Sequence, residues 1–489
     1  MRQTNKSSLS AFLMSLLVVS WSSMPAVAQS NEDINSVLQF NFSNPGARSL
    51  GMAGAFAARA DDATAVYANP AGLIQLSRPE VSVDGRSWGF QNRYLAGGTQ
   101  LNPGSLDGLS YLESDDDLDG LSFLSGFFPS RSGRWVAGLF RHQAVNFETV
   151  LATNDSTVFT QTGTGFARPR DGVLDLELDT TGASMAVRLH PRLSLGATIS
   201  RWEFAFDTRL ELYDAPRDAE FGDPVFNPFS LDDPYPGLTE ADPEICCEFG
   251  NRGDIIRLRT QTGRDETTSY SLGLFWESKR TQAGVPLVTL GGVYRKGPSF
   301  RFMGRSYIRS LGPSVSLPTT RSYASVFGDA PGIFKVPDVW SVGVSIRPSS
   351  RWVVSADWAR VEYSDLMDRF LDLAGRDSGI PNGQVGRAVD YQLDDGDELR
   401  LGFEYVVNAR SNSAPIFLRW GVWNDPNHEI EYVGPDPSQR PIFSPGSDEL
   451  HTTVGLGIKM RNNQFDLGYD RSDRVETLSF STVFYFGRN

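Results

Sequence analysis

Length, composition and charge exclude several classes of protein. The chain has 489 residues and a net charge of −14 at pH 7, which argues against nucleic acid as a partner. Hydrophobic residues make up only 40% of the chain, and beyond an N-terminal leader no run is long enough for a transmembrane helix. A soluble chain of this length normally divides into several domains, and a large β-barrel is the other way to use it.

Residues 1–28 have the pattern of a secretory signal peptide. Arg2 and Lys6 supply the positive start, an apolar stretch follows over residues 11–19, and residues 26–28 form an Ala-Val-Ala cleavage site. No cysteine follows the cut, so we do not expect a lipid-anchored lipoprotein. We expect an exported chain.

Residues 44–76 are rich in glycine and alanine and read NPGARSLGMAGAFAARADDATAVYANPAGLIQL. Such a segment buries little apolar area of its own, but its small residues let backbone pack closely in a confined space. We therefore expect it to lie inside another structure. Met52 and Ala53 after Gly51 exclude a phosphate loop, and no strand precedes the glycines as a dinucleotide site requires. Asn69-Pro70 alone is also compatible with a plain turn.

From residue 79 onward the chain alternates apolar and polar residues with a period of two, which predicts strands. In the last one, Leu478, Phe480, Thr482, Phe484 and Phe486 share one face. We expect 14 strands: 80–89, 119–128, 133–148, 172–190, 192–213, 265–277, 285–302, 338–347, 351–363, 397–408, 414–425, 449–460, 463–471 and 475–486.

The links between these strands alternate between short and long. The long ones are 90–118, 149–171, 214–264, 303–337, 364–396 and 426–448, and only the final hairpin is short where a long link was due. Short periplasmic turns and long outer loops are typical of outer-membrane barrels, which close because an open sheet edge would leave backbone groups unpaired in lipid. The pattern predicts an all-β fold, a 14-stranded antiparallel transmembrane β-barrel.

Residues 44–76 resemble the FadL/TodX family of outer-membrane transporters for long-chain fatty acids and other hydrophobic compounds, and so do residues 335–366, 398–427 and 449–486. The resemblance implies that residues 29–78 form a hatch that plugs the lumen of a barrel formed by residues 79–489. The hatch residues it singles out are Gly46, Gly51, Gly54, Asp61, Asp62, Asn69, Pro70 and Ala71.

The resemblance also implies partners. We expect a hydrophobic ligand, outer-membrane lipid and lipopolysaccharide, and the barrel-assembly machinery. Such machinery often reads a final aromatic residue, but here Gly487, Arg488 and Asn489 follow Phe486.

The strand at 192–213 changes the parity of its apolar residues near residue 200. Leu193, Leu195, Ala197 and Ile199 share one face, and Trp202, Phe204 and Phe206 lie on the other. With regular pairing the three aromatic residues point into the barrel, where they would contact a ligand. A bulge near residue 200 would instead turn them outward as an interfacial girdle. Both interpretations are open at this point.

No residue pattern indicates an enzyme, a cofactor or a metal site. Asp115, Asp117, Asp119 and Gly120 resemble the start of a calcium loop, but the twelfth position is Gly126 and not glutamate. His428, beside Asp425 and Glu429, is expected in a solvated outer loop. Cys246 and Cys247 are adjacent, which suits a vicinal disulfide or two idle thiols, and spaced zinc ligands are missing.

These observations leave two principal functions. The first is an outer-membrane channel for passive uptake of fatty acids or of aromatic or aliphatic hydrocarbons. The second is a structural or partner-binding barrel without transport activity, whose long acidic loops bind another molecule. A general hydrophilic porin fits a hatch poorly.

Overall fold

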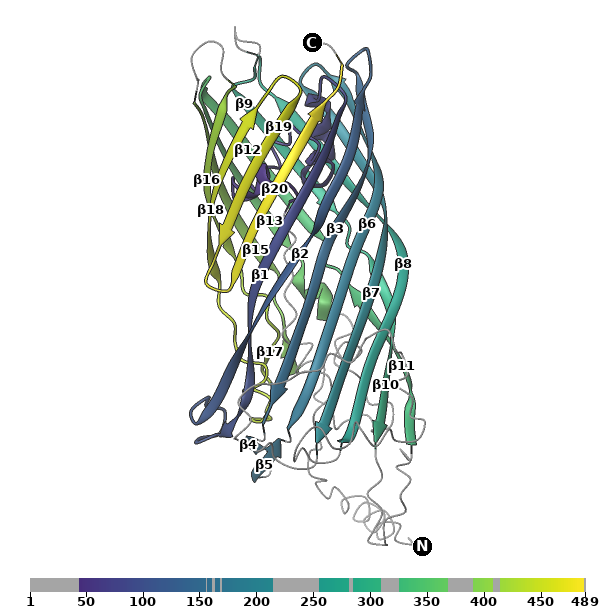
Figure 1. Ribbon diagram of the computed structural model, residues 1–489, viewed down its shortest axis with the longest axis vertical. Helices are drawn as coiled ribbons and strands as arrows, with labels where there is room; N and C mark the ends of the chain where they lie inside the picture. Colours follow the sequence, from purple (N-terminus) through teal and green to yellow (C-terminus); the bar gives the residue numbers. More distant parts are fainter. Residues whose placement is uncertain are drawn as a thin grey trace, which may run out of the picture.

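The computed structural model describes residues 44–154, 156–160, 163–167, 169–213, 255–280, 285–308, 325–367, 390–407 and 414–487. These residues form a tall barrel with the C-terminus at the end where the turns are short (Figure 1). The expected signal peptide and the cysteine pair lie outside the described residues.

Eighteen strands form the main sheet, and two more form a small separate pair. The strands of the main sheet are β1 (Glu80–Thr99), β2 (Leu109–Pro129), β3 (Trp135–Thr153), β4 (Ser156–Thr160), β5 (Gly163–Ala167), β6 (Arg170–His190), β7 (Leu193–Tyr213), β8 (Ile255–Glu277), β9 (Val288–Arg295), β10 (Ser299–Ile308), β11 (Ser325–Lys335), β12 (Val339–Ser349), β13 (Trp352–Val361), β15 (Gly396–Val407), β16 (Ile416–Asp425), β18 (Glu449–Lys459), β19 (Asn463–Arg471) and β20 (Val475–Tyr485). The small pair is β14 (Tyr391–Gln392) and β17 (Glu431–Tyr432).

The barrel closes where β1 pairs with β20, and the ring is antiparallel throughout. It has 14 members because β9 and β10 form one interrupted strand, and β11 and β12 form the next. Arg295 pairs with Val339 and Ser299 pairs with Lys335, so the register is the same on both sides of the break. The predicted 14-stranded barrel is confirmed.

The predicted strand bounds were too short on the side of the long links. β1 and β2 continue into the expected loop 90–118, β3 and β6 into 149–171, and β11 lies within 303–337. The run Asp115–Gly120 is thus in a strand that pairs with β1, and it does not form the loop that a calcium site would need. These extensions were missed because charged residues such as Arg93 and Glu113 interrupt the apolar alternation there, even though Leu112 of β2 is 50% exposed.

Large apolar side chains face outward along the barrel near the short turns. Leu139, Leu195, Leu272, Val342 and Leu456 are between 44% and 67% exposed. Aromatic residues flank this band, with Trp352 at the short-turn side and Tyr270 and Trp340 at the other. An outward apolar band between aromatic girdles is the arrangement of barrels that cross an outer membrane.

The band ends at one level across neighbouring strands. On β7 the outward residue after Ile199 is Arg201, which pairs with Thr181 of β6 and Thr268 of β8. We call the part of the barrel between this row and the short turns the membrane half, and the part beyond it the outer half. The ladder between β2 and β3 ends at Phe123 and His142, and the His142 ring contacts Tyr67 at 4.7 Å between ring centroids.

Among the described residues, four short helices lie outside the strands. They are α2 (Ala47–Leu50), α3 (Ala65–Ala68) and the 3-10 helix η1 (Pro70–Gln75), and a second 3-10 helix, η2 (Tyr363–Met367), follows β13. Within the described residues, no helix is both long and apolar enough to cross a membrane.

Candidate functional site

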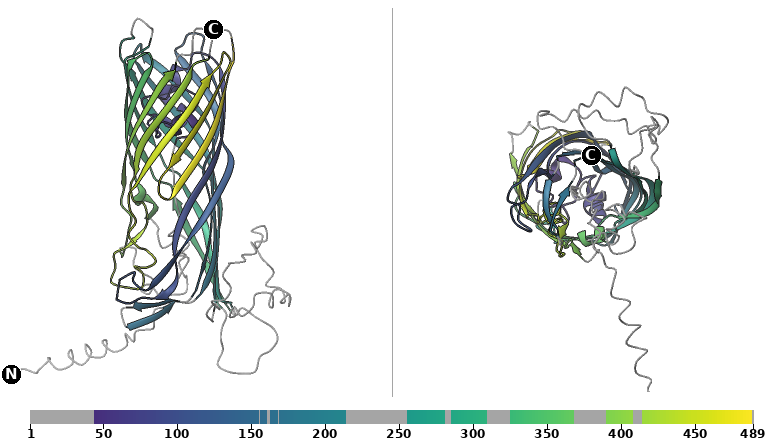
Figure 2. Two further views of the ribbon diagram at one scale, coloured as in Figure 1. Left: turned by 60° about the vertical axis from the view of Figure 1, so that its left-hand side comes forward. Right: turned by 90° about the horizontal axis from the view of Figure 1, so that it is seen from below.

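Residues 44–76, here called the inner segment, lie inside the membrane half of the barrel. Figure 1 and the end-on view in Figure 2 show its helices, drawn in purple, surrounded by strands. Its apolar side chains are almost fully buried, and Ala47, Met52, Phe56 and Leu73 have no exposed surface. The wall therefore supplies the core that this segment cannot form by itself.

The backbone of the inner segment hydrogen-bonds to side chains of the wall. Ala47 N–H donates to Ser481 Oγ at 2.8 Å, and Ala57 N–H donates to Asp357 Oδ2 at 2.7 Å. In the other direction, Thr289 Oγ1 donates to the Ala58 carbonyl oxygen at 2.7 Å. These bonds satisfy peptide groups that a short, irregular segment leaves without partners of its own.

Asn69 and Pro70 form the start of η1. Asn69 is extended, and its Oδ1 accepts from Ala71 N–H at 3.1 Å, so it caps a helix whose first residue is Pro70. Its Nδ2 donates to the carbonyl oxygens of Ala57 at 2.8 Å and Leu274 at 3.0 Å. One side chain thereby joins the helix start, another turn of the segment and β8.

The three predicted glycines lie in the first part of the segment. Gly46 has φ +93° and donates from its N–H to Asp84 Oδ2 at 3.3 Å. Gly54 has φ +69°, and the Arg400 guanidinium packs against it. Gly51 is the C-cap of α2 with a helical φ of −63°, so close packing and not an unusual φ explains it.

Asp61 and Asp62 belong to a buried ion-pair network between the segment and the wall. Arg48 contacts Asp61 at 2.8 Å and Asp62 at 3.1 Å, and Arg59 contacts Glu404 of β15 at 2.9 Å. The network has four arginines and four carboxylates, namely Arg48, Arg59, Arg347, Arg419, Asp61, Asp62, Glu404 and Asp466. Equal numbers of the two charges make partial or full burial of these groups tolerable, and Arg347 is the most exposed of the eight at 25%.

The outer half has an apolar interior. Trp202, Phe204 and Phe206 are between 0% and 4% exposed, and Phe204 stacks on Phe300 at 4.9 Å and on Phe334 at 5.4 Å between ring centroids. We call this interior the apolar lining; it includes Leu174, Leu176, Leu178, Trp202, Phe204, Phe206, Leu210, Phe300, Phe302, Phe334, Ile430, Tyr432 and Phe443.

The register of β7 decides between the two orientations left open by the sequence. Residues 193 to 212 pair with both neighbours without interruption, and shifts occur only at the strand ends. Since there is no bulge near residue 200, the interpretation as an outward girdle is wrong. Trp202, Phe204 and Phe206 face the interior of the barrel.

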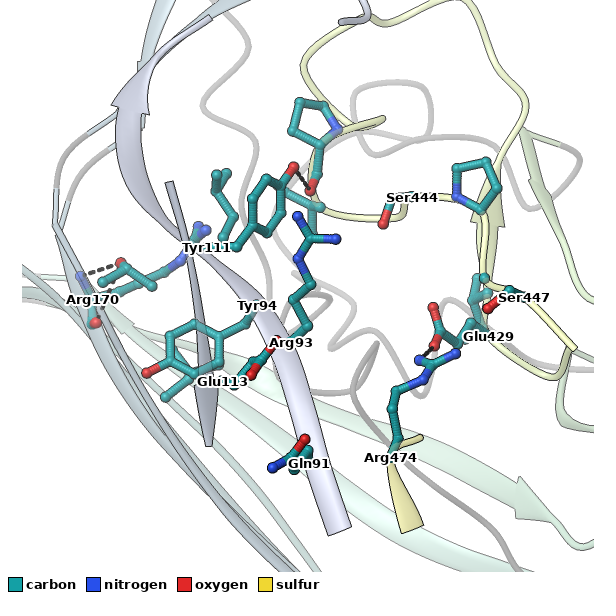
Figure 3. Close-up of a pocket in the computed structure, with 18 residues that line it drawn as sticks. Gln91, Arg93, Tyr94, Tyr111, Glu113, Arg170, Glu429, Ser444, Ser447 and Arg474 are labelled. Carbon is teal, nitrogen blue, oxygen red and sulfur yellow. Dashed lines mark hydrogen bonds and ion pairs between the residues drawn. The ribbon is translucent and has the colours of Figure 1, made fainter. Parts of the chain in front are cut away.

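A pocket of about 270 Å³ lies beside the apolar lining at the outer end. Figure 3 shows it between β1 and β2 on one side and the loop 426–448 on the other. Arg93, Arg170 and Arg474 are among the polar residues that line it, and Leu151 and Ile430 belong to both the pocket and the apolar cluster of the interior. The pocket therefore has a mixed polar and apolar lining and adjoins the apolar interior.

His428 differs from its expected solvated position. Its side chain is 9% exposed and stacks on Tyr363 at 4.9 Å, with Nδ1 3.5 Å from Asp425 Oδ1. Burial opposes its positive charge, but Asp425 and the Pro426 carbonyl outweigh burial and raise the pKa of His428 to about 9. It fastens the base of the loop 426–448.

One acidic group in the described part of the chain has the spacing of a metal site: Asp338, Glu362 and Asp365. Asp338 already accepts from Lys296 and Lys335, and Lys335 also pairs with Asp365 at 2.7 Å. We therefore interpret this group as an ion-pair cluster that fastens the break between β9 and β10 to the break between β11 and β12.

Sequence reasoning missed several residues that build this interior. Arg48 and Arg59 are charged residues in a segment of small apolar ones, and that contrast was a usable signal. Phe300 and Phe302 have the same two-residue spacing as Phe204 and Phe206. The wall residue Glu404 could not be identified from the sequence, because a glutamate in a strand is common. Its role becomes visible only once its partners Arg48 and Arg59 in the inner segment are known.

Comparison with known proteins establishes the fold. No family model and no curated protein matches the chain. Three similar solved structures are a Pseudomonas aeruginosa FadL homologue (TM-score 0.58, 14% identity), the CymD monoaromatic hydrocarbon channel (0.52, 16%) and the P. putida toluene transporter TodX (0.52, 15%). Each alignment covers 92% of this chain and 100% of the other. The resemblance to the FadL/TodX family is thus supported by structure, at the level of fold.

Proposed function

We propose that this protein is an outer-membrane channel for passive uptake of hydrophobic molecules, with the inner segment as its hatch. The observation that carries the proposal is the apolar lining, because a water-filled pore would have polar groups in that place. The fold is shared by CymD, a monoaromatic hydrocarbon channel, by TodX, a toluene transporter, and by the FadL homologue.

The route follows the geometry of the interior. A ligand enters by the pocket beside Ile430, moves onto the apolar lining around Phe204, and stops above the inner segment. A shift of the hatch then releases it. We place release to the side where the β2–β3 ladder has ended beyond Phe123 and His142. Lipopolysaccharide outside and the assembly machinery inside are the remaining partners of this proposal.

Uptake of labelled ligands tests the proposal. Cells that express the protein in a strain without a comparable channel should take up a long-chain fatty acid or an aromatic hydrocarbon faster than cells with an empty vector. Native mass spectrometry of the purified barrel should show which of these remains bound. An assembled barrel that takes up neither and binds neither would favour the structural or partner-binding alternative.

A further inference from the structure

In the described part of the barrel, the inner wall has four places where a glycine of one strand lies directly opposite a glycine of the next. Two glycines in register leave a patch of wall without side chains, on which another backbone can lie. The pairs are Gly196 with Gly273 on β7 and β8, Gly291 with Gly343 on β9 and β12, Gly402 with Gly421 on β15 and β16, and Gly455 with Gly468 on β18 and β19.

Each pair lies against the inner segment, and mostly against its backbone. A Cβ atom at Gly291 would lie 2.0 Å from the Ala57 carbonyl oxygen, and one at Gly468 would lie 2.3 Å from the Ala47 carbonyl oxygen. At Gly402 the distance to the Met52 carbonyl oxygen would be 2.4 Å, and at Gly196 the distance to Ala71 N would be 2.2 Å. Rotation of a side chain cannot relieve such contacts, because the clashing atoms are peptide atoms.

The contacts follow the wall in a fixed order. As the segment runs from residue 47 to residue 71, it meets the pair on β18 and β19, then β15 and β16, then β9 and β12, then β7 and β8. It therefore runs around the lumen in the reverse of the strand order. In the remaining section of the wall, Gly46 N–H donates to Asp84 Oδ2 of β1, and Leu73 belongs to the same apolar cluster as Phe123 of β2.

We propose that these four glycine pairs are a docking surface for the backbone of the inner segment and fix its position. The proposal extends the proposed function, in which that segment is the hatch. Ion pairs such as Arg59 with Glu404 tolerate small displacements of flexible side chains, whereas a peptide group seated on a glycine pair cannot slide past a Cβ atom. The glycines position the segment, and the ion pairs hold it there.

Two neighbouring glycines of β9 give a matched test. Gly291→Ala places a methyl group against Ala57, while Gly292→Ala meets nothing closer than 4.0 Å. Trypsin cleavage after Arg48 and Arg59, followed by mass spectrometry of the folded barrel in detergent, reports whether the segment is seated, since the two side chains are only 12% and 6% exposed. We expect roughly tenfold faster cleavage in Gly291→Ala, as overpacking against a fixed backbone predicts, and no change in Gly292→Ala.

Gly468→Ala repeats the test on the other side of the lumen, with cleavage after Arg48 as the readout. Equal cleavage in Gly291→Ala, Gly468→Ala and the wild type would overturn the proposal. So would failure of Gly291→Ala and Gly468→Ala to assemble, because the glycines would then serve the wall itself. Cleavage needs no ligand, so a protein without uptake but with these cleavage differences would refute the proposed transport and leave the docking surface intact.

Discussion

The membrane half and the outer half of this barrel have opposite polarity. In the membrane half, β7 turns Leu195, Ala197 and Ile199 outward and Ser194 and Thr198 inward, toward the inner segment. In the outer half, the same strand turns Arg201 and Glu203 outward, each more than half exposed, and its aromatic residues inward. The change occurs along one continuous strand with no bulge.

This inversion shows what surrounds each half. Successive side chains of a strand point to opposite faces, so an exchange of parity exchanges the two environments. The membrane half faces lipid outside and, inside, a segment of small residues whose backbone hydrogen-bonds to the wall. The outer half faces water outside. Its apolar surface faces inward, where a ligand or neighbouring apolar side chains can cover it. A hydrophobic molecule crossing the polar surface of the cell would meet its first apolar environment inside the outer half.

Removal of residues 44–76 should have the largest effect, because a 14-stranded ring is wider than side chains alone can fill. The deletion should leave an assembled barrel that conducts ions and admits small hydrophilic antibiotics. Planar-bilayer conductance measures this, and the shift in gel mobility between unboiled and boiled samples checks assembly. A deletion variant that inserts and stays as closed as the wild type would refute the hatch.

Replacement of Trp202, Phe204 and Phe206 by serine should come next in size. Each lost aromatic contact should weaken ligand binding by roughly 1–3 kcal/mol, so uptake of a hydrophobic probe should fall steeply while closure to ions is kept. The matched control is the outward set Glu203→Ser and Asp207→Ser on the same strand. Unchanged uptake in the aromatic variant would remove these residues from the route.

Two alanines on the same face of β7 allow a test of whether the environment outside the wall changes along the strand. Ala197 faces outward in the membrane half and Ala205 faces outward in the outer half. Arginine at 197 should cost about 2–4 kcal/mol of folding free energy in lipid, and arginine at 205 only about 0–1 kcal/mol. Denaturant unfolding in bilayers measures both. Equal costs would mean that the row at Arg201 is not the membrane boundary.

The barrel could be predicted from the sequence, but the extensions of its strands into the outer half could not. The 14 strands could be found because lipid imposes strict alternation on residues such as Leu478 and Phe480. The first residues of β2 and all of β11 were not predicted. Water surrounds the wall there and permits charged residues, so the alternation of apolar and polar residues is lost. The spacing of Trp202, Phe204 and Phe206 singled them out but left open whether they face the interior, which the register of β7 decided. The eight paired glycines could not be predicted, because register between strands is a property of the closed barrel.

His428 gives the smallest predicted effect, and it concerns the loop that covers the apolar lining. Its pKa is about 9 in the folded protein and 6.5 ordinarily. A raised pKa means that the charged form is stabilised by folding, so its contribution is complete below pH 6.5 and is lost as pH rises through about 9. Attachment of the loop 426–448 should therefore weaken in this range by about 1–3 kcal/mol.

Hydrogen exchange of residues 426–448 between pH 7 and pH 10, corrected for the intrinsic rise in exchange rate, measures this attachment. The loop carries Ile430, Tyr432 and Phe443 into the apolar lining, so its protection should fall above pH 9 in the wild type. In His428→Gln the protection should be lower at pH 7 and should no longer depend on pH. His190→Gln, at the exposed end of β6, should behave as the wild type. The same fall in the wild type and in His428→Gln would assign the pH dependence to another group and leave the loop held by its apolar residues alone.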